Sequence, residues 1–187
     1  FPDLITADSP TQRVGSVLSG KFPKVSHLTP KKSLEDVFSE EEIREWDKRI
    51  RKYLRPGEKI SFVAEMKIDG LNITLHYQNG RYVRALTRGN GLIGEDVSHT
   101  VKTIETIPLE LGQPVNLEVS GEVFMSKKSF EKMNRQQVNN EGETFANARN
   151  TAAGTVRQLD PSVAASRDLS AFFYEIGKNS FSKEPTT

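Results

Sequence analysis

A single lysine lies between two carboxylates in the segment Glu65–Gly70, which reads EMKIDG. From Ile60 onward apolar and polar residues alternate, and this alternation predicts a β-strand whose apolar side enters a core. Because successive strand side chains point to opposite faces, Glu65, Lys67 and Asp69 are expected to line one surface. A neutral lysine amine held there could act as a nucleophile. An ordinary half-exposed strand with a Glu-Lys-Asp ladder would give the same pattern.

The residues that follow predict a hairpin beside this strand. Two alternating segments, Leu71–Tyr77 and Tyr82–Arg88, flank the pair Asn79-Gly80, whose residues both tolerate the positive φ of a tight turn. Gly70 has no Cβ, so the chain can bend there or a ligand can approach the backbone. The lysine is therefore expected near a bend, next to a hairpin that ends in a second cation.

Further elements complete an α+β pattern. Ser39 with Glu42 forms a capping box that predicts a helix, and Trp46 is expected to anchor that helix in a core. Antiparallel hairpins with interspersed helices indicate an α+β fold rather than a parallel doubly wound sheet. Downstream we expect a short helix before Pro108, a strand over Val115–Val123 with Glu122 on its polar face, helices after Ser126 and over Arg149–Leu159, and a strand over Leu169–Ile176 whose two phenylalanines pack in a core.

Composition limits the classes of function. The 187 residues carry 26 basic and 25 acidic side chains, a net charge of +1, so nucleic-acid binding would require local basic clusters. The absence of cysteine excludes disulfides and thiolate metal sites, and it agrees with a reducing cytoplasm. No apolar stretch approaches the roughly 20 residues that cross a bilayer. His27, His76 and His99 lack metal-ligand spacing and are interpreted as surface or local hydrogen-bonding residues.

The chain divides into an arm and a domain. Residues 1–32 are rich in Pro, Ser, Gly and Lys and are predicted to form an extended arm or linker, followed by one domain over residues 33–187. Because the first residue is phenylalanine, we expect the chain to be a piece of a longer protein. Gly89, Gly91 and Gly94 lack the spacing of a phosphate-binding loop and are interpreted as turn glycines.

The segment around Lys67 resembles the lysine-any-Asp-Gly motif of covalent nucleotidyltransferases, which include DNA ligases, RNA ligases and mRNA capping enzymes. Further blocks in the same order make the chain similar to the bacterial NAD-dependent DNA ligases. The resemblance implies the α+β covalent nucleotidyltransferase fold, with twisted antiparallel sheets and flanking helices, and makes residues 33–187 a partial adenylation domain truncated at both ends. These blocks are Asp8–Gly15, Thr87–Gly91, Gly94–Val97, Ser120–Val123 and Phe145–Pro161.

The resemblance implies a reaction at Lys67. Its amine would attack the α-phosphorus of NAD, expel nicotinamide mononucleotide and hold AMP, which would then pass to the 5′-phosphate of a nick in double-stranded DNA for sealing. The reference pKa of lysine, about 10.4, leaves the amine protonated near neutrality, and Glu65 and Asp69 favour the charged form further. Attack therefore requires a compensating cation, Mg²⁺ or Mn²⁺, or desolvation when the nucleotide closes over the amine. The ligands of the metal stay unassigned.

The resemblance also implies which side chains hold the nucleotide. Glu65 would accept a hydrogen bond from the adenine amino group, and Arg88 would contact the ribose and phosphate side. Glu122 would bind the ribose or lie near the metal, and Tyr174 would stack on adenine. Taken alone, the pattern favours a surface ion pair between Glu65 and Lys67, and Arg88 and Glu122 could be solvated.

Two further regions complete the implied site. Ser33 and Leu34 match a pair that approaches the nucleotide through its backbone. The preceding Lys31-Lys32 departs from the family pattern, which is usually apolar there, and either perturbs that edge of the pocket or faces solvent. Arg149 and Arg157 belong to the block that contacts nucleotide phosphate and the DNA backbone, and eight residues place them about 80° apart on an ideal helix.

The whole protein is expected to be a monomer in the bacterial cytoplasm, with NAD and nicked DNA as partners and no contact with membranes. A subdomain that grips nicotinamide mononucleotide is expected before Phe1, and DNA-encircling modules are expected after Thr187. The isolated chain is therefore expected to bind adenine nucleotides without sealing nicks, and its self-adenylation from NAD is left open. Two alternatives stay open: an ATP-dependent ligase or capping-type nucleotidyltransferase, and a non-catalytic nucleic-acid-binding module.

Overall fold

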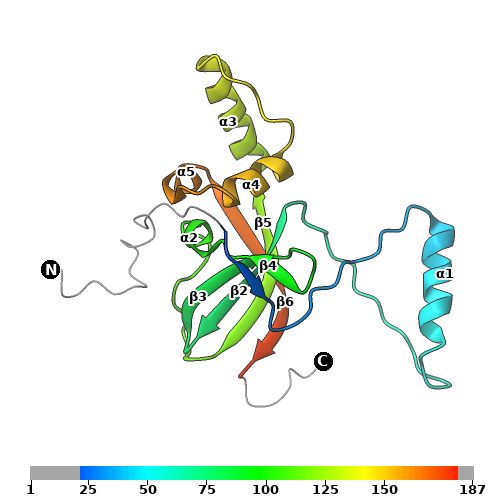
Figure 1. Ribbon diagram of the computed structural model, residues 1–187. Helices are drawn as coiled ribbons and strands as arrows, with labels where there is room; N and C mark the ends of the chain where they lie inside the picture. Colours follow the sequence, from blue (N-terminus) through cyan, green and yellow to red (C-terminus); the bar gives the residue numbers. More distant parts are fainter. Residues whose placement is uncertain (1–21, 181–187) are drawn as a thin grey trace. The chain divides into compact units, whose positions relative to one another are not determined.

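The computed structural model describes residues 22–180, which form two compact units (Figure 1). The first unit combines the described residues up to Lys31 with those from Ile68 onward, and the second comprises Lys32–Lys67. The block Asp8–Gly15 lies outside the described residues, as does the tail beyond residue 180. The predicted division into an arm over residues 1–32 and a domain over residues 33–187 stays a prediction.

A four-stranded antiparallel sheet is the framework of the first unit (Figure 1). In spatial order its strands are β3 (Arg81–Thr87), β2 (Leu71–Gln78), β5 (Leu117–Met125) and β6 (Leu169–Asn179). The predicted hairpin is confirmed, since β2 and β3 pair and the turn residues Asn79 and Gly80 have φ of 50° and 76°. Antiparallel sheets with flanking helices confirm the predicted α+β fold.

Helices and a second, two-stranded sheet complete the first unit. β1 (Lys24–Ser26) pairs with β4 (Ile93–Glu95). Side chains of Ser126, Asn147 and Asp160 cap three of the helices by accepting hydrogen bonds from backbone amides. Among the described residues, no helix has both the length and the apolarity needed to cross a bilayer. The helices are α2 (Ser98–Val101), α3 (Lys127–Asn139), α4 (Ala148–Val156) and α5 (Pro161–Ala165).

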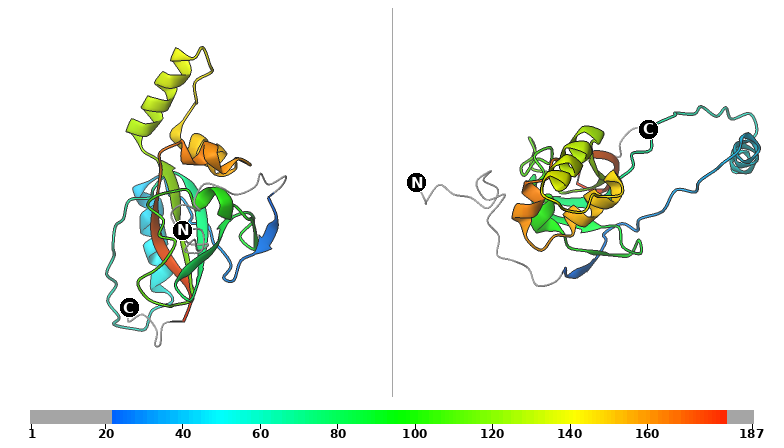
Figure 2. Two further views of the ribbon diagram at one scale, coloured as in Figure 1. Left: turned by 90° about the vertical axis from the view of Figure 1, so that its left-hand side faces the viewer. Right: turned by 90° about the horizontal axis from the view of Figure 1, so that it is seen from above.

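The core of the first unit lies against one face of the four-stranded sheet. Ile73 and Leu75 from β2 and Val123 from β5 are fully buried together with Val101 from α2, and Val156 from α4 is nearly so. Figures 1 and 2 place α3, α4 and α5 toward the end of the sheet where β5 ends and β6 begins. One face of the sheet is therefore committed to packing, and the opposite face carries the polar residues of β2 and β5.

The second unit contains one helix, α1 (Glu40–Arg51), which begins as predicted. The Ser39 side chain accepts a hydrogen bond from the Glu42 amide, which confirms the predicted cap, while the Glu42 carboxylate accepts from the Phe38 amide rather than from that of Ser39. The predicted core position of Trp46 is wrong: its side chain is 39% exposed and its ring contacts that of Phe62, with centroids 5.7 Å apart. The physical reason is size, because a unit as small as Lys32–Lys67 cannot enclose a core of its own.

The strand predicted over residues 60–69 is also wrong, since neither helix nor strand covers this described segment. Phe62, Val63 and Met66 are 56%, 85% and 88% exposed. Alternation produces a strand only where a neighbouring strand supplies backbone hydrogen bonds, and none of the described strands pairs with this segment. The surface predicted for the Glu-Lys-Asp ladder is therefore not built by a strand.

The last strand, β6, corrects one core prediction. Phe173 packs against the core as predicted, whereas Phe172 is 55% exposed and stacks on Phe124 with ring centroids 5.1 Å apart. Neighbouring strand residues point to opposite faces, so the two phenylalanines could not enter one core. β6 forms one edge of the sheet and also exposes Tyr174 and Ile176.

Candidate functional site

The sheet face opposite the core carries three polar cross-strand pairs between β2 and β5. Residues directly opposite each other on antiparallel strands lie within reach, so each pair can interact. In the middle pair, Thr74 Oγ1 and Ser120 Oγ are 3.1 Å apart and buried. This face includes the predicted site residue Glu122. The pairs are Asn72 with Glu122, Thr74 with Ser120, and His76 with Glu118.

At one end of this face, three side chains from three strands form a hydrogen-bonded chain. Asn72 Nδ2 donates to the Gly121 carbonyl at 3.1 Å and to the Tyr174 hydroxyl at 2.9 Å. The Tyr174 hydroxyl in turn donates to Glu122 Oε2 at 3.2 Å. Burial and the charge of Glu122 raise the pKa of Tyr174, so its hydroxyl stays protonated near neutrality.

This chain of hydrogen bonds suits a nucleoside. The Tyr174 side chain is 59% exposed, so an aromatic face is open for stacking while its hydroxyl is held in place. A carboxylate beside that ring can accept hydrogen bonds from hydroxyl or amino groups. Sequence reasoning named Glu122 and Tyr174 but missed Asn72, because an asparagine within a strand carries no signal of its own.

At the other end of the same face, Glu118 lies at the centre of a buried ionic cluster. Lys31 Nζ is 2.7 Å from Glu118 Oε1, and their side chains are 3% and 0% exposed. Glu118 Oε2 accepts from the Leu28 amide at 3.2 Å and lies 3.3 Å from His76 Nε2. Burial alone would raise the pKa of Glu118, but the hydrogen bond and charge of Lys31 outweigh it and the pKa is lowered. The segment Leu28–Lys31 is thus anchored to the sheet.

The two lysines of the pair have different surroundings. Lys32 is exposed and faces solvent, whereas Lys31 is buried against Glu118. Lys31 therefore ends the anchored segment, two residues before Ser33. Sequence alone gave no reason to expect Lys31 and Glu118 to meet, since 87 positions separate them.

His76 makes the free energy of unfolding depend on pH. Burial lowers the pKa of His76 from its ordinary value of 6.5, although the charge of Glu118 opposes the shift. Below pH 6.5 the unfolded chain binds a proton that the folded chain does not, so this stability is complete above that pH and decreases below it. We expect the urea midpoint to decrease on acidification from neutral pH, and to decrease less in His76→Gln. An equal decrease in both proteins would contradict the assignment.

The loop after β3 carries Arg88 at the start of a hydrogen-bonded turn. Gly89 and Gly91 have φ of 57° and 90°, which confirms them as turn glycines, whereas Gly94 lies within β4. The Asn90 side chain accepts from the amides of residues 92 and 93, and the Arg88 carbonyl lies 3.1 Å from His27 Nε2. The Arg88 side chain is exposed at this loop. It can therefore meet an anionic group of a ligand.

The two arginines of the segment Phe145–Pro161, Arg149 and Arg157, have separate partners. Arg149 lies in the first turn of α4, and its Nε donates to the Gly70 carbonyl at 3.2 Å and lies 3.5 Å from Asp69 Oδ1. Arg157 follows the end of α4, and its Nε donates to Glu95 Oε2 at 3.0 Å. Both side chains are at least half exposed, so each can exchange its surface carboxylate for a phosphate.

The remaining predicted site residues belong to the second unit, which is described by itself. Glu65, Lys67, Ser33 and Leu34 are all exposed and lie outside helix and strand. Their roles stay predictions. Across residues 22–180, no group of three or more His, Asp or Glu side chains is arranged to hold a metal ion.

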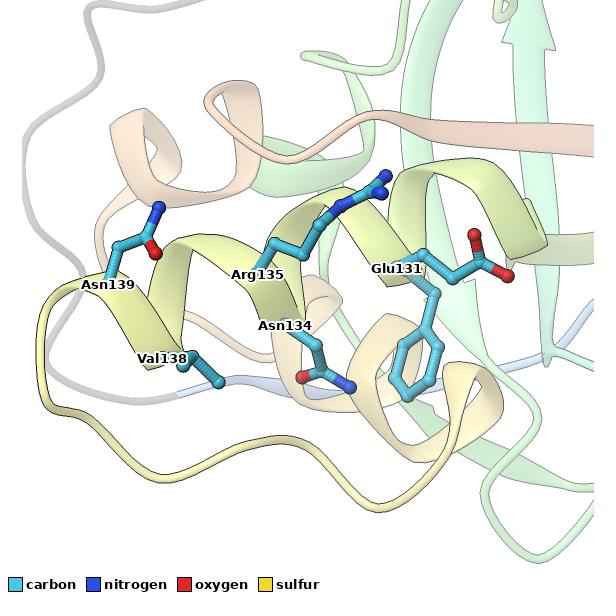
Figure 3. Close-up of a pocket in the computed structure, with 6 residues that line it drawn as sticks. Glu131, Asn134, Arg135, Val138 and Asn139 are labelled. Carbon is cyan, nitrogen blue, oxygen red and sulfur yellow. The ribbon is translucent and has the colours of Figure 1, made fainter.

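A hollow of about 450 Å³ lies along α3 (Figure 3). It is lined by Phe130, Glu131, Asn134, Arg135, Val138 and Asn139. Figure 3 shows Asn134 and Val138 on the side of the helix along which the loop to α4 runs. The Asn134 side chain holds that loop by bonding both backbone groups of Phe145. None of the predicted site residues lines this hollow.

Comparison with known proteins identifies the family. The family model for the NAD-dependent DNA ligase adenylation domain matches residues 19–187. A DNA ligase of Lysinibacillus sphaericus is 51% identical over 176 residues, covering 94% of this chain and 26% of the relative. DNA ligases of Carboxydothermus hydrogenoformans and Bacillus subtilis are 51% and 47% identical, each covering 95% of this chain and 27% and 26% of the relative. The chain spans about a quarter of these curated relatives. It belongs to the family of NAD-dependent DNA ligase adenylation domains.

Proposed function

We propose that this chain forms the lysyl-AMP intermediate of an NAD-dependent DNA ligase. The Lys67 amine attacks the α-phosphorus of NAD, a P–N bond forms, and the P–O bond to nicotinamide mononucleotide breaks as that group leaves. The AMP then passes to the 5′-phosphate of a nick in double-stranded DNA. The observation that carries the proposal is the chain from Asn72 through Tyr174 to Glu122, which presents an exposed ring beside a carboxylate within a family of adenylation domains.

The roles proposed for the first unit follow from its geometry and chemistry. Tyr174 stacks on adenine, because its ring is exposed while its hydroxyl is fixed. Glu122 accepts hydrogen bonds from the ribose hydroxyls. Arg88 meets phosphate oxygens, for which a planar guanidinium is well suited. Arg149 and Arg157 bind nucleotide or DNA phosphates.

The roles proposed for the second unit follow from the family motif. Glu65 accepts a hydrogen bond from the adenine amino group, and the backbone of Ser33 and Leu34 approaches the nucleotide. Lys67 supplies the nucleophile and must lose its proton before attack. The conditions that favour this loss are desolvation by the bound nucleotide and a neighbouring positive charge.

The proposal includes a divalent metal ion only because the lysine needs a compensating positive charge to lose its proton. The described residues alone do not form a metal site, so we derive no step through Mg²⁺. Magnesium is commonly bound by substrate phosphates together with one or two carboxylates. The proposal also includes nicked DNA as the acceptor, a monomeric state and a location in the bacterial cytoplasm.

The experiment that tests the proposal measures which nucleotide labels the protein. The chain, and any longer protein that contains it, is incubated with NAD or with ATP, and its intact mass is recorded before and after addition of nicked DNA. We expect one AMP adduct from NAD in the longer protein, mapped to Lys67 and removed by the nick. Labelling by ATP alone would favour the ATP-dependent class, and a Lys67→Ala variant with every activity intact would favour a non-catalytic module.

A further inference from the structure

Asn72 occupies a position from which it can organise the proposed nucleoside site. Its partner across the β2–β5 ladder is Glu122, and Glu122 faces Phe172 across the β5–β6 ladder. The pairing of β5 with β6 shifts register between Ser120 and Gly121. At this irregularity Tyr174 of β6 lies next to Asn72 of β2, two strands away. Asn72 Nδ2 and the Tyr174 hydroxyl are 2.9 Å apart.

The chemistry of the amide determines the direction of the hydrogen bonds. Asn72 Nδ2 has two protons, and one of them is tied to the Gly121 carbonyl, a fixed main-chain group at 3.1 Å. The other is donated to the oxygen of Tyr174, so the proton of the tyrosine is directed away from Asn72 and toward Glu122 Oε2. Without that donor, the hydroxyl and its ring would be free to choose another orientation.

We propose that Asn72 is a positioning residue for nucleoside binding: it fixes the ring of Tyr174 and, through the tyrosine hydroxyl, the carboxylate of Glu122. The proposal rests on the function proposed above, and the ligand class is a nucleotide carrying adenosine. Asn72 makes no contact with the ligand in this account. Asn72 reduces the entropic cost of binding, because the stacking face of Tyr174 and the carboxylate of Glu122 are already held in place before the nucleotide binds.

The test compares Asn72→Leu with Thr74→Val, a matched control two residues along the same face of β2. Both substitutions keep side-chain size and remove one side-chain hydrogen-bonding group from β2, but only Asn72 contacts Tyr174. With AMP as the probe, we expect Asn72→Leu to raise Kd about fivefold, the effect of losing one hydrogen bond. Thr74→Val is expected to lower the urea midpoint and leave Kd unchanged. Equal Kd values for Asn72→Leu and Thr74→Val would overturn the proposal.

Two further measurements separate positioning from a general structural effect. In a Tyr174→Phe background, Asn72→Leu is expected to change Kd little, since the hydroxyl that transmits the effect is gone. The amide hydrogen bond lowers the pKa of Tyr174, so Asn72→Leu should raise the pKa seen by NMR of ring-labelled tyrosine. Full additivity in the double variant, or an unchanged tyrosine titration, would overturn the proposal.

The outcomes also distinguish this proposal from the proposed function. If Tyr174→Ala weakens AMP binding and Asn72→Leu does not, only the positioning role of Asn72 fails. If Tyr174→Ala leaves AMP binding unchanged, the nucleoside site itself is wrong and both proposals fail.

Discussion

Replacing Lys67 with arginine is expected to abolish the AMP adduct completely while leaving AMP binding intact. Arginine keeps the positive charge and nearly the length of lysine, but its guanidinium does not lose its proton in proteins. The variant therefore retains the electrostatic attraction for phosphate and lacks only the nucleophile. The measurement is the intact mass of the longer protein after incubation with NAD, together with the Kd for AMP.

Lys59→Arg is the matched control for this experiment. Lys59 is another exposed lysine of the second unit outside helix and strand, eight residues before Lys67, and it is expected to leave the adduct unchanged. An adduct that persists in Lys67→Arg would assign the nucleophile to another residue. Loss of the adduct in both variants would mean that the substitutions disturb the fold of the second unit, rather than remove one reactive amine.

Replacing Lys31 with methionine is expected to lower the free energy of unfolding by about 3–5 kcal/mol, the cost of leaving a buried carboxylate without its partner. Glu118 is fully buried, and Lys31 Nζ lies 2.7 Å from Glu118 Oε1, closer than His76 Nε2 lies to Oε2. Methionine fills similar space without a charge, so the effect reports electrostatics rather than a cavity. Urea unfolding at neutral pH provides the measurement.

The double variant Lys31→Met/Glu118→Gln tests the reason for this effect. Removing both charges is expected to recover much of the lost stability, because an amide is far cheaper to bury than an unpaired carboxylate. Arg51→Met, which breaks the exposed pair with Asp47, is the control and should leave the urea midpoint unchanged. If Lys31→Met behaves like Arg51→Met, the buried pair does not stabilise the fold.

Local sequence signals predicted the elements whose stability is itself local. Asn79-Gly80 specified the hairpin turn, and Ser39 specified the start of α1, because in each case the decisive hydrogen bond or backbone conformation lies within a few residues. The strand expected over residues 60–69 failed for the opposite reason. Its alternation describes which side chains would share a face, but a strand also needs a neighbour, and the pattern carries no information about one.

In the candidate site, too, local patterns predicted some residues, whereas contacts between distant segments determine others. The polar alternation of β5 placed Glu122 on the correct face, and the family motif pointed to Tyr174. Neither could reveal Asn72, whose importance arises from its contact with Tyr174, 102 positions away in the chain, beside the register irregularity between β5 and β6. The burial of Glu118 likewise depends on Leu28–Lys31, a segment with no periodic pattern. Contacts between distant segments determine which polar residues are buried, and composition does not encode them.

The position of β6 at the edge of the sheet has a consequence for self-association. Among the described strands none pairs with its outer edge, and its 11 residues carry three exposed large apolar side chains, Phe172, Tyr174 and Ile176. An edge of this length with apolar side chains is a template for strands of other chains, and charged residues are the usual protection against them. Glu175 and Lys178 are the exposed charges on β6. We therefore expect these two charges to oppose pairing of β6 with strands of other chains, and their replacement by threonine to remove that protection.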